Sequence, residues 1–151
     1  MPKITPFLWF DGHTEAAVEL YTSVFPNTKV TNITRKPDGK VMSASFELEG
    51  QAFIALDGGP HYKFTEAVSF FVRCETQAEV DHYWTSLTAE GGSEQPCGWL
   101  KDRFGLSWQI IPAALERYFA DPDPARVQRV VQAMMKMKKI IIADLDRAAA
   151  S

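Results

Sequence analysis

The hydrophobic and polar positions of the chain form a pattern that occurs twice. The segment that starts at Phe7 reads "FLWFDGHTEAAVELYTSVF", and the segment that starts at Ser69 reads "SFFVRCETQAEVDHYWTSL". When the two are superimposed, Thr14 falls on Thr76, and apolar residues recur at helical spacing behind both threonines. Such self-similarity indicates an internal repeat. Each half is therefore predicted to begin with a strand that leads into a helix.

Both predicted helices carry start or stop signals. Thr76 followed by Glu79 is predicted to form a capping box, which satisfies the free amides of a helix N-terminus. The first helix is expected to stop at the "FPN" of residues 25–27. The second is expected to stop at Gly91 and Gly92, which tolerate a left-handed backbone.

Short extended runs separated by turn sequences follow each helix. The predicted strands are 29–35, 41–48 and 51–57 in the first half, and 94–98, 99–101 and 107–112 in the second. Each half thus reads strand, helix and three strands. The predicted fold class is α+β, with two tandem βαβββ modules forming a curved mixed sheet around a cleft. Residues 1–112 are predicted to hold both modules, with module one at 1–60 and module two at 66–112.

The remaining residues, 113–151, are predicted to form a C-terminal helical extension. Asp123 is placed to cap a helix that has Pro124 at its first position. The apolar stripe of this helix is expected to comprise Val127, Val130, Val131, Met134 and Met135. The stripe is expected to pack either across the edge of a module or onto a second subunit.

Composition narrows the class of protein. The chain has 151 residues, 46% hydrophobic and 23% charged, with a net charge of -3, which is typical of a globular domain. A mildly acidic chain is a poor partner for nucleic acid. No run approaches the ~20 apolar residues that cross a bilayer, so no membrane partner is expected. The start "MPKITPF" lacks a signal-peptide pattern, and Cys74 and Cys97 are expected to be reduced thiols in a cytoplasmic protein.

Several strings resemble one known family. They are "ITPFLWFDG", "AAVELYTSVFPN", "FIALDGGPHYKFTEAVSFFVRC", "EVDHYW", "CGWLKDRFGLSWQIIP" and "AMMKMKKIIIADLDRA", which together span nearly the whole chain. They resemble the PhnB-like branch of the vicinal oxygen chelate superfamily, which includes glyoxalase I, extradiol dioxygenases and bleomycin-resistance proteins. PhnB-like proteins are often labelled demethylubiquinone methyltransferases. The resemblance implies paired βαβββ modules and a homodimer.

The resemblance also implies metal ligands, mostly His and Glu, on the first and last strand of each module. The residues at those places are Phe7 with Ile54 or Ala55 in module one, and Ser69 with Gln109 in module two. Gln109 stands where the superfamily's Asp-x-x-Gly-x-x-x-Glu pattern has its carboxylate. A neutral amide and a hydroxyl do not hold a transition metal. We therefore expect no metal and no cofactor.

A cleft without a metal is predicted to bind a small molecule through aromatic and polar side chains. The candidate ligand-binding residues are Phe7, Trp9, Phe53, His61, Ser69, Trp99 and Gln109. Each has a plainer alternative: the aromatic residues could be core, His61 an exposed loop residue, and Gln109 a buried amide bonded to neighbouring strands. His13 and His82 are expected on the surface, and Cys97 is expected to be a small buried residue.

Three functions remain open at this point. The first is a metal-free protein that binds a small hydrophobic or amphipathic molecule between the modules. The second is a lyase, isomerase or dioxygenase with an unusual metal or a polar catalytic centre, and the third is a dimeric scaffold. Methyltransferase activity is not expected, because the glycines in "DGGP", residues 57–60, are followed by no helix-start pattern. No catalytic residue can be named from the sequence.

Overall fold

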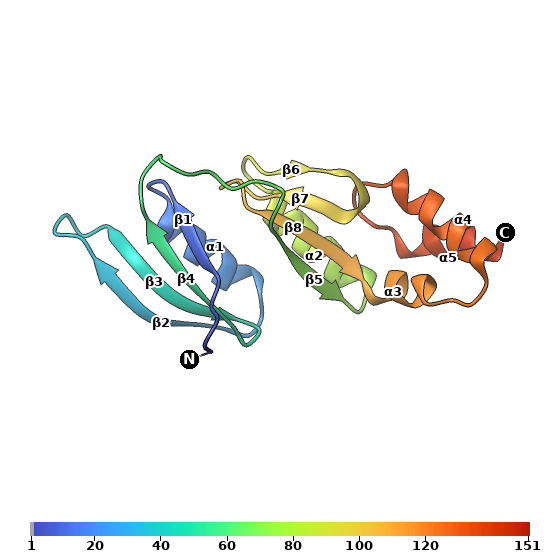
Figure 1. The fold of residues 1–151 in the computed structure, drawn as a ribbon, viewed down its shortest axis with the longest axis horizontal. Coiled ribbons are helices and arrows are strands. Elements are labelled where there is room, and N and C mark those ends of the chain that lie inside the picture. Colours follow the sequence, from blue (N-terminus) through green and yellow to red (C-terminus); the bar gives the residue numbers. More distant parts are fainter. Residues whose placement is uncertain (1) are drawn as a thin grey trace. The chain divides into compact units, whose positions relative to one another are not determined.

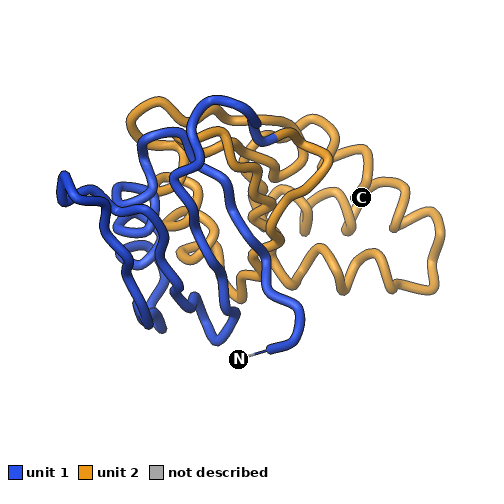
Figure 2. The backbone as a smooth tube through the Cα atoms, turned by 60° about the vertical axis from the view of Figure 1, so that its left-hand side comes forward, with its two compact units in different colours: residues 1–64 blue, residues 65–151 orange. Residues whose placement is uncertain are grey.

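The computed structural model describes residues 2–151 and divides into two compact units. The first unit ends at Phe64, and the second runs from Thr65 to Ser151 (Figure 2). The helical extension belongs to the second unit. The sequence pattern predicted this extension as a part separate from module two.

The first unit is a four-stranded sheet with one helix. Its elements are β1 (Phe7–Phe10), α1 (Thr14–Val24), β2 (Thr28–Arg35), β3 (Val41–Leu48) and β4 (Gln51–Asp57). The strand order is β1-β4-β3-β2 (Figure 1). Strand β1 pairs parallel to β4, and the other pairs are antiparallel.

The second unit repeats this plan and adds helices after it. Its elements are β5 (Ser69–Cys74), α2 (Gln77–Thr88), β6 (Ser93–Glu94), the 3₁₀ turn η1 (Pro96–Gly98), β7 (Trp99–Lys101), β8 (Ser107–Pro112), α3 (Ala113–Phe119), α4 (Pro124–Met135) and α5 (Ile142–Ala150). The order β5-β8-β7-β6 corresponds strand by strand to that of the first sheet, and β5 pairs parallel to β8 as β1 pairs to β4. The prediction of an α+β fold with tandem βαβββ modules is confirmed.

One face of each sheet packs against the helix of its module. In β1, Leu8 and Phe10 are buried while Phe7 is exposed, because successive side chains in a strand point to opposite faces. On the same buried side lies Phe46, which stacks between Tyr21 of α1 and Phe53 of β4, at centroid distances of 6.4 and 5.3 Å. In the second unit, Val80, Trp84 and Leu87 of α2 are likewise buried.

The C-terminal helices form a small core with the end of β8. Its buried members are Ile111, Leu115, Val130, Ile140, Leu145 and Ala149. Asp123 caps α4 as predicted, accepting a hydrogen bond from the amide of Ala125 at 3.0 Å. The predicted stripe is wrong at Met135, which is 65% exposed because α4 ends there.

The predicted strand at 94–98 is wrong over most of its length. Only Ser93–Glu94 pairs with β7. Pro96 cannot donate a ladder hydrogen bond, and Cys97 and Gly98 both adopt positive φ, at 62° and 83°. The chain therefore turns where the residue types alone suggested an extended run.

The two helix starts differ although the sequences align. Thr76 is the N-cap of α2 and its hydroxyl accepts from the Glu79 amide at 3.2 Å, as predicted. The Glu79 carboxylate accepts from the amide of Glu75 at 3.2 Å, one residue earlier than a capping box requires. Thr14 instead is the first residue of α1, behind His13 as N-cap.

Among residues 2–151, no helix combines the length and apolar character needed to span a bilayer.

Candidate functional site

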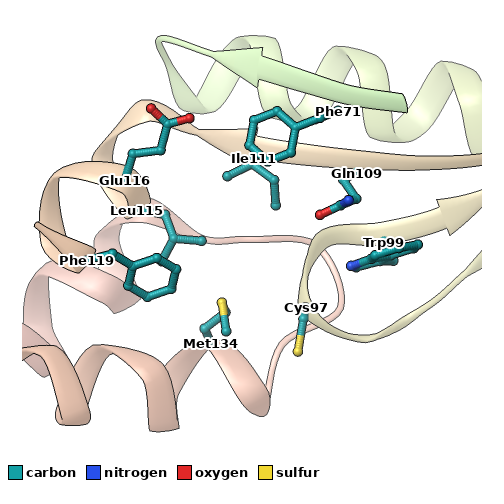
Figure 3. Close-up of a pocket in the computed structure, with 9 residues that line it drawn as sticks. All are labelled: Phe71, Cys97, Trp99, Gln109, Ile111, Leu115, Glu116, Phe119 and Met134. Carbon is teal, nitrogen blue, oxygen red and sulfur yellow. The ribbon is translucent and has the colours of Figure 1, made fainter. Parts of the chain in front are cut away.

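A pocket of about 270 Å³ opens on the second unit, between its sheet and the C-terminal helices (Figure 3). On the sheet side it is lined by Phe71 of β5, Cys97 of η1, Trp99 of β7, and Gln109 and Ile111 of β8. These residues lie on the face that does not carry α2. Trp108 and Ile110, which alternate with the two lining residues of β8, are buried on the opposite side.

Strand register explains why three of these side chains lie together. Gln109 is the direct partner of Phe71 in the parallel pair and of Trp99 in the antiparallel pair. Directly paired residues place their side chains side by side on one face. The amide of Gln109 therefore lies in a row between two aromatic rings.

The helices supply the other side of the pocket. Leu115, Glu116 and Phe119 come from α3, and Met134 comes from α4. Glu116 is the one carboxylate in the lining, and its Oε2 lies 3.2 Å from the Arg73 guanidinium. The helical side is thus apolar except for a carboxylate that already has a cation beside it.

The turn η1 is held against the C-terminal segment by its backbone. The amide of Cys97 donates to the Met137 carbonyl at 2.9 Å, and the amide of Gly98 donates to the Lys138 carbonyl at 2.8 Å. A Cβ on Gly98 would lie 2.8 Å from Cδ1 of Ile111. Only glycine combines the positive φ with this close approach.

Gln109 is both a structural and a pocket residue. Its Nε2 donates to the Ser69 hydroxyl at 3.0 Å, which ties β8 to β5. This bond turns the carboxamide oxygen toward the pocket (Figure 3). The neighbouring Trp99 ring turns its indole nitrogen to the same side. The polar end of the pocket therefore presents an acceptor and a donor next to each other.

The positions that the resemblance implies for metal ligands do not fit a metal. Phe7 and Ile54 are direct partners in the first sheet, and both are hydrocarbon side chains. Ser69 and Gln109 satisfy each other through a neutral hydrogen bond. Across residues 2–151, no three His, Cys, Asp or Glu side chains gather into a possible metal site.

The four candidates from the first unit do not line this pocket. Phe7 is 56% exposed and His61 lies exposed in the segment after β4. Phe53 is buried in the core beside α1, because it is one of the alternate residues of β4 whose side chains point to that face of the sheet. Trp9 packs its ring against Gly58 and donates its indole N–H to the Gly59 carbonyl at 2.9 Å.

Of the seven predicted residues, Trp99 and Gln109 line the pocket, and Ser69 supports Gln109. Sequence reasoning did not find the other lining residues. Phe71 and Ile111 could have been found from the two-residue period of β5 and β8, since each shares a face with a predicted residue. The three residues of α3 carried no such signal, because nothing in the sequence placed that helix against the sheet. Met134 belongs to the apolar stripe predicted for α4, which was expected to pack either across the edge of a module or onto a second subunit.

The two cysteines differ in environment, and both are free thiols. Burial raises the pKa of Cys74 to about 12, with a smaller effect from Glu79 and Glu75. Cys97 was predicted to be buried, but it is partly exposed and lines the pocket. A thiol reagent in solution therefore meets one accessible thiol, at the pocket.

Comparison with known proteins places the fold in a family. The 3-demethylubiquinone-9 3-methyltransferase family matches residues 2–111. The chain belongs to this family. It is the PhnB-like branch of the vicinal oxygen chelate superfamily that the sequence resembles. A search of the curated proteins returns no match.

Solved structures agree with the family. A PhnB protein from Bacillus cereus is 34% identical, with a TM-score of 0.69 over 74% of this chain and 99% of its own. Protein PA1353 from Pseudomonas aeruginosa is 23% identical, with a TM-score of 0.61 over 74% and 98%. The fosfomycin resistance protein FosX from Listeria monocytogenes, in a hexagonal crystal form, shares the fold at 15% identity and a TM-score of 0.50 over 72% and 89%.

The family match ends at residue 111, although the resemblance seen in the sequence ran into the C-terminal helices. Four of the residues that line the pocket, Leu115, Glu116, Phe119 and Met134, therefore lie beyond the part shared with this PhnB-like family. The pocket combines a sheet face common to the family with helices outside the match.

Proposed function

We propose that this PhnB-like protein binds a small hydrophobic or amphipathic molecule in the second-unit pocket, without a metal ion. The observation that carries the proposal is the pocket itself. It is lined by the apolar side chains of Phe71, Ile111, Leu115, Phe119 and Met134, and it has few polar groups. Small-molecule sites have this composition, and its volume of about 270 Å³ is close to the lower end of their usual range.

Methyl transfer and metal-assisted chemistry have less support. A methyl donor would need an open turn at the glycines after β4. The Trp9 ring fills the space beside Gly58, where a Cβ would lie 2.2 Å from the ring. The chain also runs from Gly59 into a non-helical segment rather than a helix. The metal positions carry hydrocarbon or mutually bonded neutral side chains.

The proposal can be tested with N-phenyl-1-naphthylamine, a neutral probe whose fluorescence rises in apolar sites. We expect saturable binding of one probe per chain, unchanged by EDTA. Alkylation of Cys97 with N-ethylmaleimide should abolish binding, because the adduct occupies the pocket lining. The Cys97→Ala variant, treated in the same way, should still bind.

Besides an absence of saturable binding, two results would overturn the proposal. Binding that survives full alkylation of Cys97 would place the probe elsewhere. Binding that is lost on chelation and restored by a divalent transition metal would show a metal-dependent site. The extent of alkylation is read by intact-protein mass spectrometry.

A further inference from the structure

We propose that the ligand is a neutral molecule with an apolar body that ends in a group able both to donate and to accept a hydrogen bond. An alcohol, a phenol or a primary carboxamide has this chemistry. The inference rests on the proposed function and specifies the ligand class. It depends on the donor and the acceptor at the polar end of the pocket, and on the charge of the lining.

The acceptor is Oε1 of Gln109. The Ser69 hydroxyl takes a hydrogen bond from Nε2, which fixes the amide with its oxygen toward the pocket (Figure 3). In the described part of the chain no group donates to this oxygen. A bound molecule with a hydroxyl or N–H can do so.

The donor is the indole N–H of Trp99, which differs from the other tryptophans. Their indole nitrogens donate within their own units: Trp9 to the Gly59 carbonyl at 2.9 Å, Trp84 to the Glu94 carboxylate at 2.6 Å, and Trp108 to the Asp102 carboxylate at 3.0 Å. The Trp99 nitrogen has no such acceptor among residues 2–151 and faces the pocket. Tryptophan N–H groups usually find a partner when they are withdrawn from water, and a ligand oxygen would supply it.

The charges around the pocket disfavour an anionic ligand. No Lys or Arg lines the pocket, and the guanidinium of Arg73 beside it already contacts Glu116 of the lining at 3.2 Å and lies 4.0 Å from Glu75. A ligand carboxylate would leave water without gaining a cation of its own. Burial of an uncompensated charge is strongly unfavourable.

The apolar lining limits the body of the ligand. The side chains of Phe71, Ile111, Leu115, Phe119 and Met134 line the pocket beside Gln109. They offer aromatic and aliphatic contacts and no hydrogen bonds, which favours a ring or a short alkyl chain. A pocket of about 270 Å³ suits one such body rather than a long lipid.

Three matched competitors of the naphthylamine probe test the ligand class. 4-Butylphenol donates and accepts, 4-butylanisole only accepts, and 4-butylbenzoate is an anion at pH 7. We expect the phenol to compete about three- to tenfold more strongly than the anisole, which lacks one hydrogen bond. We expect the benzoate to be weaker than the phenol by more than about tenfold.

Two variants assign the hydrogen bonds to the residues named. Gln109→Leu should narrow the gap between phenol and anisole while the probe still binds, because only the phenol donates to Oε1. Trp99→Phe should weaken both competitors by a similar factor and leave the gap, because both accept from the indole N–H. Gln51→Leu and Trp9→Phe are matched controls, since both remove the same groups at residues that do not line the pocket. The controls should keep both the full preference and the affinities of the two competitors.

The outcomes separate the two proposals. If the probe does not bind the pocket, the proposed function and the ligand class both fail. If it binds but the anisole or the benzoate competes as well as the phenol does, the ligand class is wrong while the proposed function stands. A phenol preference that survives in Gln109→Leu, or unchanged affinities of both competitors in Trp99→Phe, would also overturn it.

Discussion

Asp57 at the end of β4 connects three segments of the first unit. Its carboxylate accepts hydrogen bonds from Nζ of Lys36 at 2.6 Å and from the amide of Gly12 at 2.8 Å. The bond from Lys36, followed by that from Gly12, lowers the pKa of Asp57 from its usual 3.8. A carboxylate whose pKa is lower in the folded state binds protons less readily there than in the unfolded chain.

The pH dependence of stability follows from this shift. The contribution of Asp57 is complete above its unfolded pKa of 3.8, and it is lost as the pH falls through the lower folded value. Asp57→Asn should reduce the free energy of unfolding by about 1 kcal/mol at pH 7 and make it less sensitive to pH below 4. Urea unfolding at pH 7, 4 and 3 measures both effects. Asp11→Asn on the neighbouring turn is the control, and an equal effect there would contradict the assignment.

At the same scale, Phe53 shows the limit of prediction from residue type. Phe53 was a candidate to line a site, with the core as the alternative, and its strand was placed correctly at Gln51–Asp57. A period of two fixes which residues share a face, but it does not tell which face carries the helix. Phe53 faces α1, whereas Trp99 and Gln109 face the pocket.

The two aligned threonines allow a comparison at the scale of the element. The Thr76 hydroxyl caps α2, whereas Oγ1 of Thr14 is buried in α1 and finds no hydrogen-bond partner among the described residues. Thr76→Val should lower the free energy of unfolding by about 1 kcal/mol, since a cap is lost. Thr14→Val should leave it unchanged or raise it by up to about 1 kcal/mol, because an unsatisfied hydroxyl becomes a methyl group. Equal losses in urea unfolding would show that Thr14 also has a capping role.

Substitutions at Gly98 and Gly105 distinguish the cost of backbone strain from the cost of close packing. Both have a positive φ, 83° and 87°. A Cβ on Gly105 would meet nothing within 4 Å, whereas one on Gly98 would lie 2.8 Å from Ile111 and 3.1 Å from Ile140. Gly105→Ala should cost about 1 kcal/mol of unfolding free energy through strain, and Gly98→Ala about 1–3 kcal/mol more through overpacking. Urea unfolding of the two variants measures the difference. Equal losses of unfolding free energy would mean that η1 shifts to make room for the added methyl group.

Elements were predicted well where the pattern was local. The strands β3, β4, β7 and β8 have the predicted bounds, because alternation and turn residues lie within each segment. The strand expected at 94–98 failed because Cys97, a residue that rarely adopts positive φ, does so next to Gly98. Helices α3 and α5 were not separately predicted, and the pocket depends on α3.

At the scale of the whole molecule, the repeat determines the sheets and the extension determines the pocket. Both sheets follow one strand order, which the repeated pattern in the sequence predicted. For the extension, the sequence allowed two predictions, packing on a module or packing on another subunit. It packs on its own unit, through the core that Ile111 shares with Leu115 and Val130. That contact joins residues whose sequence patterns are unrelated, so no repeat could reveal it.

The side chain of Gln77 on α2 fastens the C-terminal segment to module two. Its Nε2 donates to the Ile140 carbonyl at 3.0 Å, and its Oε1 accepts from the Ile142 amide at 2.8 Å. Beside it, Lys139 pairs with Asp81 at 2.9 Å. Hydrogen bonds from Gln77 and then Lys139 lower the pKa of Asp81. One residue outside the pocket thus holds the segment that leads from α4 to α5.

Gln77→Ala should therefore loosen the extension without touching the pocket lining. Two partly buried backbone groups lose their partner, and each lost bond costs about 1 kcal/mol. Amide hydrogen exchange should accelerate at Ile142 and at Cys97 and Gly98, whose amides donate to the same segment. The naphthylamine probe should bind more weakly, since α3 and α4 form one side of its site. Gln132→Ala on the exposed side of α4 is the control. Faster exchange with unchanged probe affinity would mean that the sheet face alone forms the site, and that the helices beyond the family match contribute nothing to binding.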